Sequence, residues 1–343
     1  MAELGRSDIV AQYYVRIEDS FLEPGERGFG TRLNNFFDAL NDYANNVEEF
    51  PVREALIASA RDLAGAMNEL ANRINALRTN ANEEVRNIVP EINNLATIIA
   101  STNRQIRAAE LDNSVANDIR DERDRALDRL ARLIDVNYTE RADGQITVRV
   151  GSEVLIDETG ARELITVPNS ALDPVRQDLL EVRLADTGSV LRVSGGELYG
   201  ALQMRDTAIP QLMGRMDRIA AAIIEGINSI HSQGNGTVNL TGTVTSTNAV
   251  SNAATSLNAA GLPFAVNLPG SFQIAVYDNT GNLIAGAPFT IALNPGDSLN
   301  TLAAAINAAA PGILSAVVNA NNTLSMTATA GFSFVFSNDT SNV

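Results

Sequence analysis

Apolar residues recur with helical spacing from about Arg53 to Gln105. The steps between them alternate four and three, which is the heptad pattern of a coiled coil, and Arg, Glu, Asp and Asn fill the positions between. At Leu77, Ala81 and Val85 two steps of four follow each other, a stutter that locally unwinds a left-handed supercoil. The pattern therefore predicts a rod, or a bundle of long helices, with one narrow apolar stripe. The stripe consists of Leu56, Ala60, Leu63, Met67, Leu70, Ile74, Leu77, Ala81, Val85, Ile88, Ile92, Leu95, Ile99 and Ile106.

Pro90 lies inside this pattern, where it lacks a backbone donor and crowds the preceding turn. Either the helix is kinked near Val89, or one helix ends there and another begins at Pro90. Because the periodicity continues on both sides, we expect a kinked helix.

Shorter helices are predicted on both sides of the long one. A short apolar periodicity fills the first 23 residues, a break rich in Pro and Gly follows, and Thr31 is a suitable N-cap for the next helix. A highly charged helix is expected over 117–135, where Asp121 with Arg125 and Asp128 with Arg132 are spaced four apart. A second apolar stripe, from Leu212 to Ile230, predicts a returning helix.

Two stretches have the period of two that is typical of strands. In the first, strands are predicted at 145–150, 153–156, 163–167 and 179–184, with Asp143-Gly144 as a hairpin turn. In the second, strands are predicted at 271–277, 288–293, 313–319, 323–328 and 332–336, around a helix capped by Asp297 or Ser298.

The fold class is therefore α+β and multidomain, with a long-helix bundle or coiled-coil-like domain and inserted β-rich domains. We expect a first helical part at 1–134, a small β-rich section at 135–195 and returning helices of the helical domain at 196–234. The last domain, 235–343, is expected to be β-rich with a β-β-α-β-β unit.

Composition and charge exclude several classes of protein. A net charge of -16 argues against a nucleic-acid partner, and no apolar run is long enough to span a membrane. The start of the chain lacks the features of a cleavable secretory signal, and the absence of Cys excludes disulfides and thiolate chemistry. All 25 basic residues are Arg.

No catalytic, cofactor-binding or metal-binding group can be assembled from the sequence. The one histidine, His231, ends the second apolar stripe, where a helix C-terminus favours it. The glycines of SGGELYGAL lack the Lys and Ser/Thr of a phosphate loop, and Arg side chains neutralise the Asp-rich helix at 117–135. We therefore predict that the protein is not an enzyme.

Six blocks, in this order, resemble the family of flagellar hook-filament junction proteins, the FlgK family. They are GFGTRLNNFFDALNDYANN, VREALIASARDLAGAMNELANRINALR, EINNLATIIASTNRQI, NDIRDERDRALDRLARLIDV, SGGELYGALQMRD and LMGRMDRIAAAIIEGINSIHSQG, covering roughly residues 15–234. Separately, PFTIALNPGDSLNTLAAAINAAAPGILSAVVNANNTLSMTA is similar to an insertion motif of several flagellar axial proteins.

The resemblance implies a structural component of the bacterial flagellum, secreted by the flagellar type III export apparatus and located outside the cell. It implies self-association of the full-length protein into a junction ring, contacts with the hook protein and the second junction protein, and an export chaperone for the C-terminal end. Against the family plan, we expect this chain to be truncated at both ends, because most of the N-terminal coiled-coil segment and the C-terminal return helices are missing.

The charged helix supplies the candidate site. We expect its side chains to form lateral subunit contacts or structural contacts, although an ordinary solvated helix face would have the same composition. The candidate residues are Arg120, Asp121, Arg123, Asp124 and Arg125.

Two alternative functions remain open at this point. One is another flagellar axial subunit, such as the second junction protein or a flagellin-like protein. The other is an extracellular adhesin or binding module, in which the Thr- and Asn-rich β domain from residue 235 onward binds a ligand.

Overall fold

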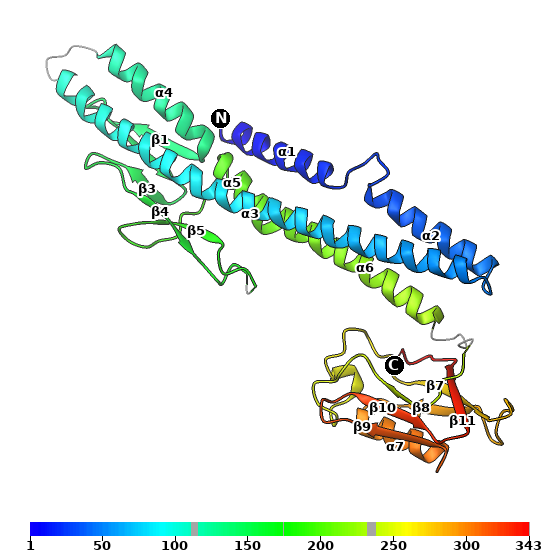
Figure 1. Cartoon of the computed structure of the whole chain (residues 1–343). Coiled ribbons are helices and arrows are strands. Elements are labelled where there is room, and N and C mark those ends of the chain that lie inside the picture. Colours follow the sequence, from blue (N-terminus) through cyan, green and yellow to red (C-terminus); the bar gives the residue numbers. More distant parts are fainter. Residues whose placement is uncertain (111–115, 174, 232–237, 343) are drawn as a thin grey trace. The chain divides into compact units, whose positions relative to one another are not determined.

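The computed structural model describes the whole chain except residues 111–115, 174, 232–237 and 343. The helices and strands of the chain are drawn in Figure 1. The chain forms two units, Met1–Asp217 and Arg218–Val343, and each has its own hydrophobic core. Unit 1 combines long helices with two small antiparallel sheets, and unit 2 combines two three-stranded sheets with a helix. The predicted α+β class is confirmed.

Unit 1 is organised around α3 (Phe50–Ala109), a helix of 60 residues. At a rise of 1.5 Å per residue, α3 is roughly 90 Å long. The helices α1 (Ala2–Ser20), α2 (Phe29–Asn45) and α4 (Asn117–Leu133) all contact it. In Figure 1, α2 lies beside one end of α3 and α4 beside the other.

The predicted apolar stripe is the buried side of α3. Six of its members are completely buried, and they follow one another at steps of four or seven residues. They are Ile74, Ala81, Val85, Ile92, Ile99 and Ile106. Pro90 is exposed and the helix continues through it, so the chain does not end one helix and begin another at this proline.

The first helix packs closely on α4. Gly5 lies where any Cβ would overlap the carbonyl oxygen of Arg132, so this approach requires glycine. The apolar side of α1 then buries Ile9, Tyr13 and Ile17 in the core of unit 1.

A small β section follows α4. Strands β1 (Val136–Glu140), β2 (Ile146–Val150) and β3 (Glu153–Ile156) form one antiparallel sheet, and β4 (Leu164–Pro168) pairs with β5 (Leu180–Leu184) in another. Four of these strands lie within one residue of the predicted ranges, and β1 lies where the sequence changes to a period of two. In β2, Ile146, Val148 and Val150 alternate inward.

Asparagine side chains of α3 bind the strands of this section. Asn103 donates to the carbonyl of Ile146 (2.8 Å) and accepts from its N–H (3.1 Å), and Asn93 does the same with Leu164 (2.8 Å each). Asn82 accepts from the N–H of Leu180 (2.9 Å) and donates to the carbonyl of Asp178 (3.1 Å). Asn93 and Asn103 therefore pair with strand backbone as a neighbouring strand would, and Asn82 pairs with the start of β5 and the turn before it.

The chain returns to helix at α5 (Gly196–Gln203), which contacts α1, α3 and α4. A π-helical turn, Met204–Ala208, connects α5 to α6 (Ile209–His231) without a break. Ile209 is buried in the core of unit 1, and Leu212, Met213 and Met216 pack against it.

Unit 2 contains β6 (Thr243–Thr245), a 3-10 turn (Leu257–Ala259), β7 (Gly270–Asp278), β8 (Phe289–Leu293), α7 (Leu299–Ala309), β9 (Leu314–Val318), β10 (Leu324–Ala328) and β11 (Phe332–Ser337). The strand orders are β6-β10-β9 and β11-β7-β8. All five predicted strands are present, in the order β-β-α-β-β followed by β11, and only β6 was missed. The division of the chain into four segments stays a proposal.

Local chemistry explains α7. Ser298 is its N-cap and forms a reciprocal capping box with Thr301. Asn307 then binds β9 as the asparagines of α3 bind their strands: it donates to the carbonyl of Ala316 (2.8 Å) and accepts from its N–H (2.7 Å).

Burial along α3 predicts a large difference between two valines. Val85 is completely buried, whereas Val15 on α1 is 56% exposed. Val85→Ala should lower the free energy of unfolding by about 2 kcal/mol through lost packing, and Val15→Ala should change it by less than about 0.5 kcal/mol. Both substitutions gain the same helix propensity, so urea unfolding of the pair isolates the effect of burial. Equal effects would mean that the stripe is not the core of unit 1.

Candidate subunit-contact site

The five candidate residues of α4 divide into an inner and an outer group. Arg120 points toward the β section, where its Nε and Nη2 donate to the two carboxylate oxygens of Glu110 (2.8 Å each). Its Nη1 donates to Oε1 of Glu140 at 2.6 Å. The guanidinium therefore joins the end of α3, α4 and strand β1.

Arg123 is even more enclosed, at 4% exposed. Its Nη1 donates to the carbonyl of Gly144 (2.8 Å), in the turn between β1 and β2, and its Nη2 lies 3.7 Å from Oε1 of Glu140. Gly144 has a φ of +77°, which suits glycine at a tight turn. Arg120 and Arg123 thus hold the β1–β2 hairpin on α4.

The other three candidates are exposed. Arg125 donates from Nε to the backbone carbonyl of Asp121 (3.1 Å), and the Asp124 carboxylate, 61% exposed, lies 3.3 Å from Nε of Arg123. Asp121, Asp124 and Arg125 therefore form the outward part of the candidate site, open to a partner.

The inner ion pair changes the titration of Glu110. The hydrogen bonds from Arg120 are the largest cause, followed by the N–H of Ala116 (3.1 Å), and together they lower the pKa of Glu110 from its ordinary 4.5 to about 2. The hydrogen bonds to the carboxylates of Glu110 and then Glu140 raise the pKa of Arg120 above its ordinary value.

The remaining arginines of α4 join several helices. The Glu197 carboxylate, in the first turn of α5, accepts from Nη1 of Arg129 (2.8 Å) and Nε of Arg132 (3.0 Å). Arg132 also pairs with Asp8 of α1 at 2.6 Å. This ion-pair network ties α1, α4 and α5 together.

A buried arginine at the π-helical turn was missed by sequence analysis. Arg205, 1% exposed, donates from Nη1 to the Leu180 carbonyl (2.6 Å) and to Oδ1 of Asn82 (2.9 Å). Its Nε and Nη2 donate to the Asp206 carboxylate (2.7 and 2.8 Å). Arg78 donates to the backbone carbonyl of Arg205 (2.9 Å). The only signal was an arginine next to apolar helix positions, which gives no hint of a π-helical turn.

Among the described residues, no group of three or more His, Cys, Asp or Glu side chains is arranged to hold a metal ion. No helix in the same part of the chain is long and apolar enough to cross a membrane.

Comparison with known families decides the relationship. The family described as "Flagellar hook-associated protein FlgK helical domain" matches residues 14–248. The chain belongs to the FlgK family. A second family, the "Flagellin hook IN motif", matches residues 271–330 of unit 2. The resemblance of the six sequence blocks to the FlgK family is therefore confirmed, and so is the similarity of the later segment to a flagellar insertion motif.

Curated relatives agree with this family. Flagellar hook-associated protein 1 of Salmonella typhimurium is 26% identical over 223 residues, which are 63% of this chain and 40% of the relative. The Escherichia coli protein of the same name is 26% identical over 241 residues, 68% of this chain and 44% of that protein. That of Bacillus subtilis is 22% identical, covering 67% and 50%. The FlgK-family chain therefore spans half or less of the length of these relatives.

A solved structure shares the fold. The flagellar hook junction protein FlgK from Burkholderia pseudomallei superimposes with a TM-score of 0.56, at 20% identity, over 97% of this chain and 61% of that one. Because the two sequences are only 20% identical, this structural similarity shows a shared fold and nothing further about the chain.

Glu110 predicts an acid-dependent loss of stability in this FlgK-family chain. Its folded pKa is depressed, so its contribution is present above pH 4.5 and is lost as the pH falls toward 2. The stability difference between wild type and Glu110→Gln should therefore shrink over that range, measured by urea unfolding at several pH values. Glu122→Gln, at an exposed position of α4, corrects for the change in net charge. A difference that is constant with pH would contradict the ion pair.

Arg205 predicts that arginine and lysine are not interchangeable at the π-helical turn. Arg205→Lys keeps the charge but loses the planar fork that reaches Leu180, Asn82 and Asp206, so it should cost about 2 kcal/mol in urea unfolding. Arg125→Lys, at an exposed position on α4, should cost less than about 0.5 kcal/mol. A similar cost for both would show that the Arg205 network adds no stability.

Proposed function

We propose that this chain is part of a structural subunit of the bacterial flagellum that forms the junction between hook and filament. The observation that carries the proposal is the FlgK helical-domain match over residues 14–248, supported by relatives named flagellar hook-associated protein 1. The protein works by assembly rather than by catalysis, outside the cell and after export through the flagellar type III apparatus.

The architecture of unit 1 suits such a role. A junction subunit must keep its shape under load, and α3 supplies one continuous helix with a buried stripe along its length. The asparagine contacts hold the β section along the same helix, so the outward-facing parts are carried by a stiff support.

Several finer features belong to the same proposal. The full-length protein self-associates into a ring and contacts the hook protein and the second junction protein, and an export chaperone binds its C-terminal end. Neither nucleic acid nor a membrane is a partner. The absence of Cys is consistent with export of an unfolded chain, since no disulfide can form beforehand.

Within the candidate site we assign two roles. Arg120 and Arg123 are structural, because their guanidinium groups are used by Glu110, Glu140 and Gly144. Asp121, Asp124 and Arg125 supply the lateral contact between subunits, because they are exposed on one helix.

Deletion of the complete gene in its native host tests the function. We expect cells with hooks but no filaments, and filament protein in the medium, by electron microscopy and by protein analysis of the medium. A plasmid carrying the whole gene should restore filaments. A double Asp121→Ala, Arg125→Ala variant, which leaves Asp124 on Arg123, should restore them poorly, whereas Glu83→Ala with Arg86→Ala, an exposed ion pair on α3, should restore them fully. Normal filaments in the deletion strain would refute the junction role.

A further inference from the structure

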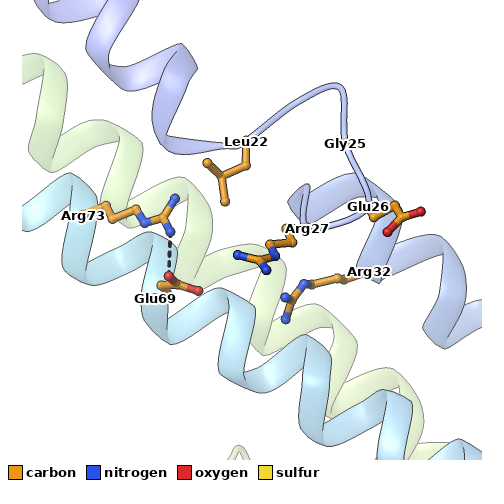
Figure 2. A pocket seen from close by; sticks show the side chains of 7 residues that line it. All are labelled: Leu22, Gly25, Glu26, Arg27, Arg32, Glu69 and Arg73. Atoms are coloured by element: carbon orange, nitrogen blue, oxygen red, sulfur yellow. Dashed lines mark hydrogen bonds and ion pairs between the residues drawn. The ribbon is translucent and has the colours of Figure 1, made fainter.

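A polar cavity of about 590 Å³ lies in unit 1 between α3 and the connection from α1 to α2 (Figure 2). Its size is within the range of roughly 300–1,000 Å³ that binding pockets occupy. Three of the lining side chains are arginines, which is a high concentration of guanidinium groups in a protein with a net charge of -16. The cavity is lined by Leu22, Gly25, Glu26, Arg27, Arg32, Glu69 and Arg73.

Two of the three arginines, Arg73 and Arg32, form ion pairs, but one N–H group of Arg32 has no acceptor among the described residues. Arg73 pairs with Glu69 at 2.5 Å, one turn earlier on α3, and Nη1 of Arg32 pairs with Asp62 at 2.6 Å. The Nε–H of Arg32 is buried and has no acceptor among the described residues. Buried donors are nearly always paired in native proteins, so this one indicates a missing acceptor.

Arg27 has no partner at all within the described part of the chain. It is exposed on the connection between α1 and α2, and it makes no hydrogen bond or ion pair there. In Figure 2 its guanidinium points into the space between the connection and α3, whereas the carboxylate of Glu26 points away from the three arginines. Within the described residues, the cavity therefore holds an arginine without an ion-pair partner, Arg27, beside the unsatisfied donor of Arg32.

We propose that this cavity binds an aspartate or glutamate side chain of a second copy of the chain. A guanidinium and a carboxylate form short, charge-assisted and often bidentate hydrogen bonds, so Arg27 and Arg32 are suited to this ligand. The chain has 41 acidic and 25 basic residues, so a carboxylate is the charged group that a second copy most often presents.

The inference rests on the proposed function, because a junction subunit must contact copies of itself. In the ring of the proposed function, the arginine cavity of one copy faces an acidic side chain on a different surface of the next copy, which is a head-to-tail contact. Head-to-tail contacts generate rings when the rotation closes and helical assemblies when it does not.

Sedimentation velocity of the chain at a series of concentrations and low salt tests the proposal. Arg27→Glu should weaken self-association about tenfold or more, the size expected for loss of a charged hydrogen bond, and Arg27→Gln should weaken it less. High salt should weaken wild type and abolish the difference between the variants. The matched control is Arg61→Glu, an exposed arginine of α3 outside the cavity, which should change association less than about twofold.

Circular dichroism establishes that the variants fold, which is expected because Arg27 is exposed and makes no hydrogen bond or ion pair with the other described residues. A wild-type chain that stays monomeric, or an Arg27→Glu variant that associates like wild type, would overturn the proposal. So would an equal effect of Arg61→Glu, since the repulsion would then not be specific to the cavity.

Citrate tests whether the cavity binds a free carboxylate anion instead of a carboxylate side chain of a second copy. If calorimetry finds citrate bound about tenfold more tightly to wild type than to Arg27→Glu, while both associate equally, the cavity is a site for a free anion and the second-copy proposal is wrong. The outcome of these association and binding measurements is independent of the outcome of the gene deletion. Normal filaments in that strain would refute the junction role and leave the association data standing, whereas failed association would refute only the cavity.

Discussion

A strand that packs against a helix has backbone groups that the helix backbone cannot pair, because its own N–H and C=O groups are used internally. This protein meets that constraint with asparagine. The amide of Asn carries a donor and an acceptor, so one side chain satisfies both groups of a strand residue. Asn93, Asn103 and Asn307 each do so for a single residue, and Asn82 does so across two.

The contacts also depend on the regularity of α3. Asn82 and Asn93 are eleven residues apart, close to three full helical turns, so they project from nearly the same side of the helix about 16 Å apart. The stutter has the same interval, because two steps of four and one of three lead from Leu77 to Ile88, eleven residues on. A break at Pro90 would destroy this alignment, because Pro90 lies between the two asparagines, and the continuous helix preserves it.

Much of the fold could be predicted because it follows from local rules. The burial of Ile74, Val85 and Ile92 follows from heptad spacing, the alternation in β2 from a period of two, and the start of α7 from the capping preference of Ser298. The candidate site could be predicted from the sequence only in part. Spacing placed Arg120 to Arg125 on one helix, but which of them turn toward the hairpin depends on how α4 meets β1 and β2. The roles of Asn82 and Arg205 depend on residues distant in the sequence, and an isolated Asn or Arg on a helix looks like any solvated side chain.

The asparagine contacts have a consequence for chemical ageing. Asparagine deamidates when the following backbone nitrogen attacks the side-chain amide, and the aspartate that results has no N–H to donate. In the interior of α3 that nitrogen already donates to the carbonyl four residues earlier, and the side-chain amide of Asn103 is held by Ile146. The helix that positions these amides therefore also keeps them from the attack that would release the strands.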